Sequence, residues 1–369
     1  MGLRTEEFDY VLPKEMIAQA PEKERSASRL LALHRHDGTI EHASFADITR
    51  YLREGDVLVL NDTKVLPARL KGNKPTGGLV DMLLVEKIDE HRWSCLVDGA
   101  KKAVEKFDAK VGDIQVSLER KGQFWNADFL DASADEVMAT HGTMPLPHYI
   151  KRGENGMGAL DAERYQTVYA ETRGSIAAPT AGLHFTDELL NRISMMGVTI
   201  VKITLHIGVG TFFLVKKEYV EEHRMHREYF SVKPDIPELL RHAKARGGRV
   251  LAVGTSAART LETLSAGDYN GLGDRAGNGP GDGPCNGSGN NYGSDKGLGA
   301  LQGYTELFIH PGYRFTAIDG IITNFHLPRS TPLMLVCAFA GKENIFEAYR
   351  QAMALSYRFY SYGDAMLIV

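Results

Sequence analysis

The sequence predicts a mixed α/β main domain that carries a small inserted all-β barrel. The apolar run Val57–Leu60 is typical of a strand buried on both faces of a sheet. Between residues 66 and 143 the segments are short and strand-like, and helix signals are scarce. After Pro145 the pattern of a mixed α/β domain, with both helix and strand signals, returns. The chain has 369 residues, enough for two such units. We therefore predict a discontinuous α/β catalytic domain over 1–65 and 144–369, with the barrel over 66–143.

Short elements of both kinds are predicted before the barrel. A helix is expected over Lys14–Gln19, because prolines stand on both sides of it. A strand over Arg29–His34 and a helix over Phe45–Leu52 follow. The buried strand then delivers the polar segment Asn61–Lys64 to its carboxyl end, where ligands usually bind in open α/β sheets.

The predicted barrel rests on segments with the length and composition of short strands. Turns rich in Gly, Asp, Asn and Lys separate them, and helix signals are scarce apart from a turn around Ala134–Thr140. The segments are Val80–Val85, Arg92–Val97, Ile114–Leu118 and Phe124–Phe129.

Helix and strand signals are clear in the second part of the main domain. Thr186 caps a helix with an acidic first turn. The next strand alternates over Val201–Ile207, so that His206 shares a face with the hydroxyl of Thr204 and the cation of Lys202.

Another helix, strand and helix follow in order. Asp235 caps a helix that runs to about Arg246, and Arg249–Val253 is a strand. Gly254 then leads directly into a helix from about Ala257.

The C-terminal part contains a compositional anomaly followed by ordered elements. About a third of residues 266–300 are Gly, without a hydrophobic period, which predicts a flexible insertion and not a phosphate loop. A helix from Ser330 to Gly341, a helix over Ile345–Leu355 and a strand over Ala365–Val369 complete the chain.

Composition excludes several classes of protein. The net charge of −4 argues against nonspecific polyanion binding but not against a nucleic-acid substrate. No apolar run reaches the length of a membrane span and no secretory signal is visible. Cys95, Cys285 and Cys337 form neither a disulfide framework nor a zinc ribbon. We expect a cytoplasmic monomer without a metal or a membrane partner.

Two polar turns are the first candidates for a site. Asn61–Lys64 follows a buried strand, and an Asx-type turn with exposed charges explains it equally well. Ala178–Phe185 precedes a helix, where small residues let a ligand approach backbone N–H groups. A structural turn with a hydrogen-bonded histidine is the alternative there.

Further polar turns repeat this pattern. In His206–Phe212, a histidine, two glycines and a hydroxyl again follow a strand. Gly254–Ser256 joins a strand to a helix and could hold an anion, with Arg259 one turn into that helix. Simple N-capping of the helix is the alternative for Gly254–Ser256. Thr323–Pro328 follows another strand. His223 and His226 have a spacing that could suit a metal, but no carboxylate or cysteine set supports one.

Aromatic and basic groups complete the candidates. Tyr357–Asp364 concentrates aromatic side chains around an arginine, which can stack a nucleobase, although core packing is the commoner use. Basic patches occur at Arg69 with Lys71–Lys74, at Lys101–Lys106 and at Arg241–Arg249, and solvated surface is the alternative for each. The recurrence of polar turns at strand ends favours an enzyme.

Seven long segments of the chain match one family in the right order: Asn61–Leu70, Ala177–Phe185, His206–Phe212, His223–Glu228, Gly254–Glu262, Ile322–Thr331 and Tyr357–Met366. They resemble the S-adenosylmethionine:tRNA ribosyltransferase-isomerases of queuosine biosynthesis. The resemblance covers essentially the whole chain apart from residues 266–300. Leu214 and Arg329 stand where the family tends to have proline and lysine.

The resemblance implies an unusual use of S-adenosylmethionine as co-substrate. The ribosyl group would be transferred and isomerised onto 7-aminomethyl-7-deazaguanine at the wobble position of GUN-anticodon tRNAs. The products would be epoxyqueuosine-tRNA, adenine and methionine. The family fold, an α/β domain with an inserted β-barrel, agrees with the reading from the residues alone.

The chemistry needs a base near neutral pH beside the sulfonium, and histidine suits this need. We expect the acid–base groups to be His184, His206 and His326, with Asp62 and Lys64 orienting the substrates. Thr180, Thr211 and Asn324 would hydrogen-bond sugar or base, and Arg259 with the basic patches would meet tRNA phosphate. The remaining expected substrate-binding residues are Gly182, Gly208, Gly210, Thr255, Ser256, Arg358 and Tyr362.

Two rival functions remain at this stage. A conventional S-adenosylmethionine-dependent tRNA methyltransferase would form S-adenosylhomocysteine, but a Gly-rich G-x-G-x-x-G turn after an early strand is missing from the sequence. A noncatalytic RNA-binding protein would bind tRNA without consuming the co-substrate. It fits poorly with the acidic net charge and the clustered histidines.

Overall fold

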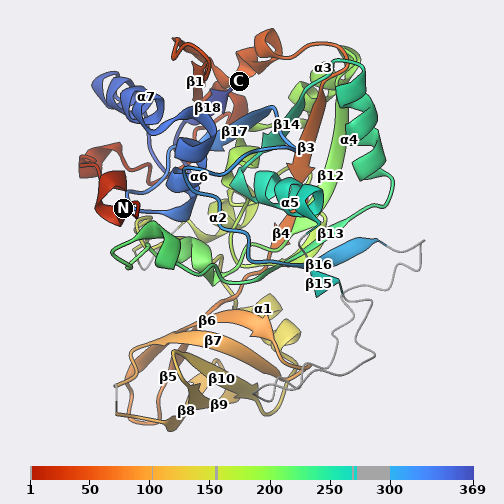
Figure 1. The fold of residues 1–369 in the computed structure, drawn as a ribbon. Coiled ribbons are helices and arrows are strands. Elements are labelled where there is room, and N and C mark those ends of the chain that lie inside the picture. The colour runs from red at the N-terminus through yellow and green to blue at the C-terminus, as the bar shows by residue number, and fades with distance from the viewer. Residues whose placement is uncertain (1, 102, 154–156, 268–269, 272–299) are drawn as a thin grey trace.

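A ten-stranded sheet forms the centre of the main domain. The computed structural model describes residues 2–101, 103–153, 157–267, 270–271 and 300–369 (Figure 1). The strands of this sheet are β1 Arg29–Leu33, β2 Ile40–Ser44, β3 Val57–Asn61, β12 Thr199–Leu205, β13 Glu228–Val232, β14 Val250–Val253, β15 Asn270–Gly271, β16 Leu301–Thr305, β17 Gly320–Asn324 and β18 Ala365–Ile368. Their order is β15-β16-β13-β12-β3-β14-β17-β18-β1-β2.

The middle of the sheet is parallel. Val59 of β3 lies opposite Val201 of β12 on one side and Ala252 of β14 on the other, and β14 pairs in parallel with β17. Strands β13 and β16 extend one flank in antiparallel fashion, and β18 pairs antiparallel with β17 on the other. The carboxyl ends of β12, β3, β14 and β17 therefore meet at one edge of the sheet.

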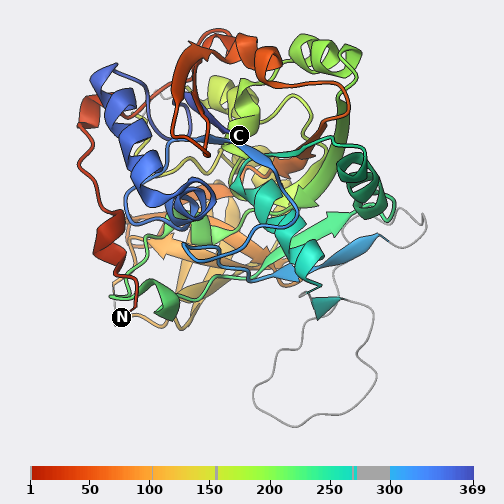
Figure 2. The same cartoon turned by 45° about the horizontal axis from the view of Figure 1, so that its top comes forward.

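Both faces of the sheet are buried, as the sequence predicts for residues 57–60. Val57 and Val59 belong to a core shared with four helices, whereas Leu58 and Leu60 belong to a core on the opposite face. The first core includes residues of α4 Ile236–Ala245, α5 Thr255–Ala266, α6 Thr331–Ala340 and α7 Lys342–Ala354. The second includes residues of α3 Asp187–Met195 and of the 3₁₀ helix η4 Phe45–Tyr51. Figure 2 shows α6 and α7 side by side on one flank, α4 on the other and α5 between them.

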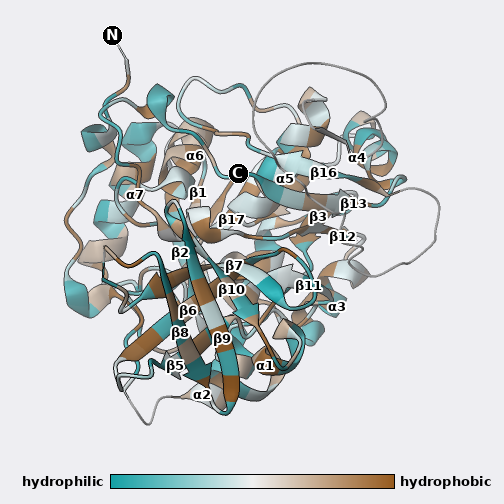
Figure 3. Cartoon of the chain, turned by 90° about the horizontal axis from the view of Figure 1, so that it is seen from below, coloured by the Kyte–Doolittle hydropathy of each residue, from teal (hydrophilic) through white to brown (hydrophobic). Residues whose placement is uncertain are grey.

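A closed barrel lies beside this main domain, below it in Figure 1. Its strands are β5 Arg69–Asn73, β6 Leu79–Lys87, β7 Arg92–Asp98, β8 Lys106–Val111, β9 Ile114–Lys121 and β10 Phe124–Phe129, in the order β10-β7-β6-β5-β8-β9. Figure 3 shows hydrophobic and hydrophilic bands alternating along them, because alternate side chains point into the barrel. Helix α1 Ala134–His141 contributes Val137 and Met138 to the same core.

The predicted fold class is confirmed. The barrel strands lie inside the predicted limits 66–143, and those limits themselves stay a prediction. Strands β5 and β8 were not predicted, since the basic residues within them were assigned to charged patches. Most of the predicted Gly-rich insertion, 268–269 and 272–299, lies outside the described residues.

Short elements complete the described chain, and one of them corrects a prediction. Instead of a helix over Lys14–Gln19, the chain forms only a 3₁₀ turn there, because the Ala18 N–H bonds to the Phe359 carbonyl and Ile17 bridges to Phe359. The remaining elements are η1 Thr5–Phe8, η2 Lys14–Met16, η3 Arg25–Ala27, η5 Thr180–His184, η6 Val209–Phe212, η7 Val220–Glu222, α2 Gly158–Arg164 and the parallel pair β4 Thr63–Val65 with β11 Thr172–Ser175. In the described part of the chain, no helix combines the length and apolarity required to span a bilayer.

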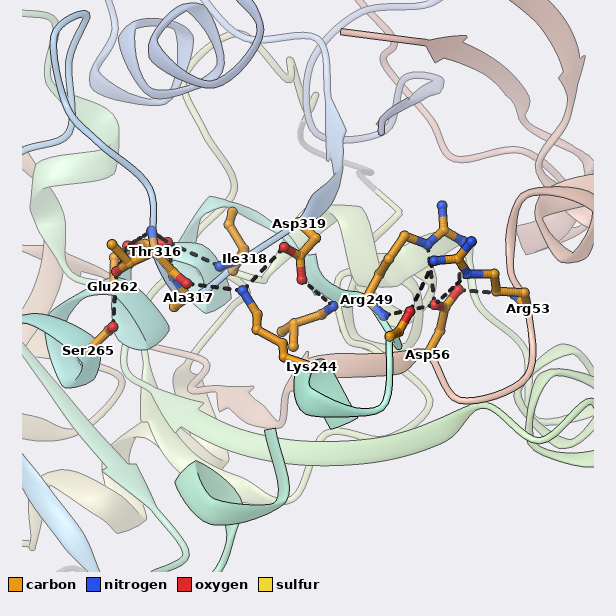
Figure 4. A network of polar contacts seen from close by, with 12 residues as sticks. Arg53, Asp56, Lys244, Arg249, Glu262, Ser265, Thr316, Ala317, Ile318 and Asp319 are labelled. Carbon is orange, nitrogen blue, oxygen red and sulfur yellow. Dashed lines mark hydrogen bonds and ion pairs between the residues drawn. The ribbon is translucent and has the colours of Figure 1, made fainter. Parts of the chain in front are cut away.

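A polar network holds β14 in place (Figure 4). The buried carboxylate of Asp56 accepts hydrogen bonds from the Arg249 side chain, at 2.6 Å to Nη2, and from the Arg53 N–H. Burial alone would raise the pKa of Asp56, but these hydrogen bonds lower it below its ordinary value. Asp319 accepts from the Val250 N–H at 2.9 Å and so fixes the start of the strand that leads into α5.

Candidate active site

A cavity of about 420 Å³ opens where the parallel strands end. Three chain segments contribute polar groups to its wall: the turn around Thr180, the start of α5 at Gly254–Ser256, and the end of β17 at Thr323–His326. The sequence predicts each of these segments as a candidate separately. Tertiary structure brings them to one wall, because they follow neighbouring strands or pack against their ends.

The start of α5 offers polar groups to the cavity. Gly254 adopts φ of 90°, a backbone conformation that favours glycine, and turns the chain from β14 directly into the helix. Thr255 and Ser256 line the cavity from the first turn of the helix, where the helix dipole favours negative charge. Ser256 Oγ also accepts a hydrogen bond from Asn61 Nδ2 at 3.1 Å. The helix therefore begins two positions before the predicted Ala257, and both polar residues face the cavity.

Asn324 connects the cavity to His184. Asn324 Oδ1 accepts from Thr180 Oγ1 at 2.7 Å, and its Nδ2 donates to His184 Nε2 at 3.2 Å. On the other side of the imidazole, His184 Nδ1 lies 2.7 Å from Ser28 Oγ. Thr180 and Asn324 line the cavity, whereas His184 lies behind them against the Phe45 ring and lines a smaller recess. The imidazole of His184 thus holds Asn324 in position.

His326 is the predicted acid–base histidine that lines the cavity itself. Its Nε2 lies 2.7 Å from Thr323 Oγ1, and its backbone is held by Tyr349 and Tyr10, whose hydroxyls bond to the N–H and to the carbonyl. Burial lowers the pKa of His326 to about 3. The imidazole is therefore neutral at pH 7.

His206 and Asp62 are placed away from the cavity lining. His206 Nδ1 lies 2.8 Å from Thr63 Oγ1, its ring stacks on Tyr229, and burial lowers its pKa to about 4. Asp62 accepts from Thr204 Oγ1 at 2.7 Å, and burial raises its pKa. Lys64 is exposed on β4. His206 contacts Thr63 of β4, Asp62 precedes this strand and Lys64 lies on it, and none of the three lines the cavity.

The predicted glycines and hydroxyls have different positions. Gly182 is packed so tightly that a Cβ atom there would lie 2.0 Å from Tyr169 Oη. The Gly208 N–H donates to Glu228 at 2.8 Å, and Gly210 lines the cavity. Thr211 lies in η6.

Arg358 and Tyr362 take part in structural contacts outside the cavity lining. Arg358 bonds to Glu22 and to the Ala20 carbonyl. The buried hydroxyl of Tyr362 donates to Asp161 at 3.0 Å, and Asp161 is also held by Arg152. Neither side chain is arranged as a nucleobase-stacking platform at the cavity.

Several lining residues were not predicted as site residues. Glu228 pairs with Arg259 and lines the cavity beside His226. The aromatic side chains of Phe308, Phe325 and Tyr360 also line the cavity. The pattern His223–Glu228 already stood out in the sequence, but the burial that makes Glu228 chemically interesting exists only in the fold.

The buried histidines make stability sensitive to acid. Burial, with the charges of Arg25 and Arg358, lowers the pKa of His184 to about 3, from an ordinary 6.5. The unfolded chain therefore binds more protons between these values, so the free energy of unfolding falls as pH decreases below 6.5. At pH 5 this histidine alone is expected to cost about 1–2 kcal/mol relative to pH 7.

The His184→Gln variant tests this expectation. Its stability, measured by denaturant unfolding from pH 7 to pH 5, should fall less steeply than that of the wild type. His36→Gln, at an exposed position, should keep the wild-type slope. Equal slopes for all three proteins would contradict a neutral, buried His184.

The fold and the cavity together define the class of protein. Ligands of open α/β sheets bind at the carboxyl ends of the strands, and small-molecule sites are concave, mostly apolar and equipped with few polar groups. The cavity described above has this position and composition. The chain is an α/β protein with a concave cavity at the edge of the sheet where proteins of this class bind small molecules.

The family follows from comparison with known proteins. A family model described as Queuosine biosynthesis protein matches residues 5–368. The chain belongs to this family. Among the described residues, no group of three or more His, Cys, Asp or Glu side chains is arranged to hold a metal ion.

Similar proteins are known from several bacteria. Proteins named S-adenosylmethionine:tRNA ribosyltransferase-isomerase are 46% identical in Caldanaerobacter subterraneus subsp. tengcongensis and 44% identical in Halothermothrix orenii, with 100% of each chain covered. A crystal structure of S-adenosylmethionine tRNA ribosyltransferase from Thermotoga maritima is also similar, at 34% identity and a TM-score of 0.52. That match covers 98% of this chain and 100% of the other.

Proposed function

We propose that this enzyme transfers and isomerises the ribosyl group of S-adenosylmethionine onto 7-aminomethyl-7-deazaguanine at the wobble position of GUN-anticodon tRNAs. The products would be epoxyqueuosine-tRNA, adenine and methionine. The observation that carries the proposal is the full-length similarity to proteins named for this ribosyl transfer. The cavity supports it, since its lining residues Thr180, Gly254–Ser256, Arg259 and Thr323–His326 belong to the segments that resemble the family.

The size and lining of the cavity suit S-adenosylmethionine. A volume of about 420 Å³ lies within the range of small-molecule sites. Phe308, Phe325 and Tyr360 offer apolar surface to an adenine ring. Thr180 and Asn324 offer hydrogen-bonding groups to a ribose or a base.

The position of His326 makes it the best candidate for the base. Of the three predicted histidines, it alone lines the cavity, and its lowered pKa keeps the imidazole unprotonated at neutral pH. In the tautomer in which Nε2 donates to Thr323, Nδ1 can accept the proton from the carbon next to the sulfonium. His184 would act as a positioning residue through Asn324.

Other predicted roles change with the geometry. Arg259 is only 9% exposed and paired with Glu228, so it does not present its charge to a phosphate on the surface. Exposed lysines of the barrel, Lys71 on β5 and Lys106 on the neighbouring β8, are better placed to meet tRNA phosphates. Asp62 and Lys64 would support the site from behind its wall.

Product analysis separates the proposal from both rivals. The protein is incubated with S-adenosylmethionine and tRNA that carries the deazaguanine precursor, and mass spectrometry follows nucleosides and small molecules. Adenine and methionine released with epoxyqueuosine are the expected products. S-adenosylhomocysteine would indicate a methyltransferase instead. Binding of tRNA without any consumption of S-adenosylmethionine would indicate a noncatalytic RNA-binding protein.

A further inference from the structure

A buried ion pair forms one side of the cavity. Arg259 of α5 and Glu228 of β13 are 9% and 5% exposed, and both line the cavity. Arg259 Nη1 bonds to Glu228 Oε2, and Arg259 Nε donates to the Leu307 carbonyl at 3.0 Å. The Gly208 N–H donates to Glu228 Oε1 at 2.8 Å. Both side chains are therefore held in fixed orientations.

One end of the guanidinium has no partner within the described residues. Arg259 Nη2 is fully buried and makes no hydrogen bond there. A buried donor left unpaired costs about 1–3 kcal/mol, more when it is charged, and native proteins rarely leave such groups unsatisfied. Arg259 is among the residues that line the cavity, so an anion bound there is the partner that we infer for Nη2 once the guanidinium opens to it.

A second feature at the same wall favours an anion. Helix α5 has 12 residues and begins at Thr255, so the N-terminal end of its dipole faces the cavity through Thr255 and Ser256. Arginine matches a carboxylate in two parallel hydrogen bonds.

Glu228 limits the kind of anion that fits. A phosphate would bring further negative charge next to this carboxylate, which raises the electrostatic cost of binding. Each carboxylate oxygen of Glu228 has spare lone pairs beyond its present bond. A ligand with a carboxylate and an ammonium on neighbouring atoms would satisfy Arg259 and Glu228 together and leave the cavity electrically balanced.

We propose that the Arg259–Glu228 pair recognises an α-amino-acid headgroup, with the carboxylate on Arg259 Nη2 and the start of α5, and the ammonium on Glu228. Resting on the proposed function, this assigns the pair to the methionine end of S-adenosylmethionine. The same site would bind free methionine as a product.

The test compares ligands that differ only in this headgroup. Isothermal titration measures binding of S-adenosylmethionine and of decarboxylated S-adenosylmethionine to the full-length protein. The wild type is expected to prefer the intact ligand by about 10- to 100-fold, the range for hydrogen bonds to a charged group. In Arg259→Met this ratio should fall to within about threefold of one.

Matched variants separate recognition from stability. Arg249→Met removes another arginine–carboxylate pair, one with a buried carboxylate and a partly buried arginine, away from the cavity, and should keep the wild-type ratio. Arg259→Lys keeps the charge but loses the planar fork, so its ratio should also fall if Arg259→Met does not fold. Glu228→Gln should weaken the preference for L-methionine over its deaminated analogue, 4-(methylthio)butyrate.

The outcomes distinguish this inference from the proposed function. A wild type without preference for the carboxylate, or an Arg259→Lys variant with the full preference, would overturn the assignment even if ribosyl transfer proceeds. Competition by inorganic phosphate as effective as that by methionine would instead indicate a general anion site and also overturn it. Absence of any S-adenosylmethionine consumption by the wild type would refute the proposed function itself.

Discussion

The variant His326→Ala is expected to lower kcat by about 10²- to 10⁴-fold, the usual contribution of a positioned general base, while S-adenosylmethionine still binds. The imidazole lines the cavity, and Thr323 with the backbone contacts from Tyr10 and Tyr349 fixes its place. Its pKa of about 3 keeps it neutral at pH 7. Single-turnover release of adenine, measured with saturating co-substrate, checks the effect.

Two histidine variants serve as comparisons. His184→Ala should raise KM more than it lowers kcat, because His184 acts on the ligand only through Asn324. His36→Ala, at an exposed position, should leave both constants unchanged.

The acid limb of the wild-type kcat/KM profile should lie well below pH 6, since a base with a pKa of about 3 stays unprotonated there. Turnover within a few-fold of wild type in the triple variant His184→Ala, His206→Ala, His326→Ala would show that none of these imidazoles is the base.

The variant Glu262→Ala is expected to lower the free energy of unfolding by about 3 kcal/mol or more, since each buried donor left unpaired costs about 1–3 kcal/mol. Glu262 lies fully buried in α5. Its carboxylate accepts from the N–H groups of Thr316, Ala317 and Ile318 (Figure 4), at 3.0, 2.9 and 3.2 Å. It also accepts from the hydroxyl of Tyr313 at 3.2 Å. Removing it leaves all four donors without this acceptor; the Ile318 N–H is buried and the other three are partly buried.

Ser265→Ala is the matched control for this prediction. Ser265 lies on the same helix and bonds to Thr316, but it is exposed, so its loss should change stability by less than about 0.5 kcal/mol. Denaturant unfolding at pH 7 measures both variants. A Glu262→Ala protein as stable as Ser265→Ala would mean that the loop around Thr316 finds other partners.

Local patterns in the chain were sufficient for most of the fold. The apolar run at Val57–Leu60 is typical of a buried strand and forms β3. The segment Phe124–Phe129 has the length and composition of a strand and forms β10. Strand β5 escaped prediction because Lys71 and Asn73 make it look like surface, although Leu70 and Gly72 are buried inside the barrel wall. The predicted helix over Lys14–Gln19 is wrong because prolines on both sides of a segment are compatible with either a helix or a 3₁₀ turn. Contacts to Phe359 favour the 3₁₀ turn in the fold.

The sequence by itself determined the fold class, the family and the polar segments that come together at the cavity, because turn chemistry and hydrophobic period are local properties. Only the tertiary structure decided which side of each segment faces the cavity. It put His326 on the cavity and His184 behind Asn324, and it buried Arg259 against Glu228. Burial, and pairing between residues distant in the chain, set the pKa of a histidine and decide which groups a guanidinium can contact. No local sequence pattern encodes either property.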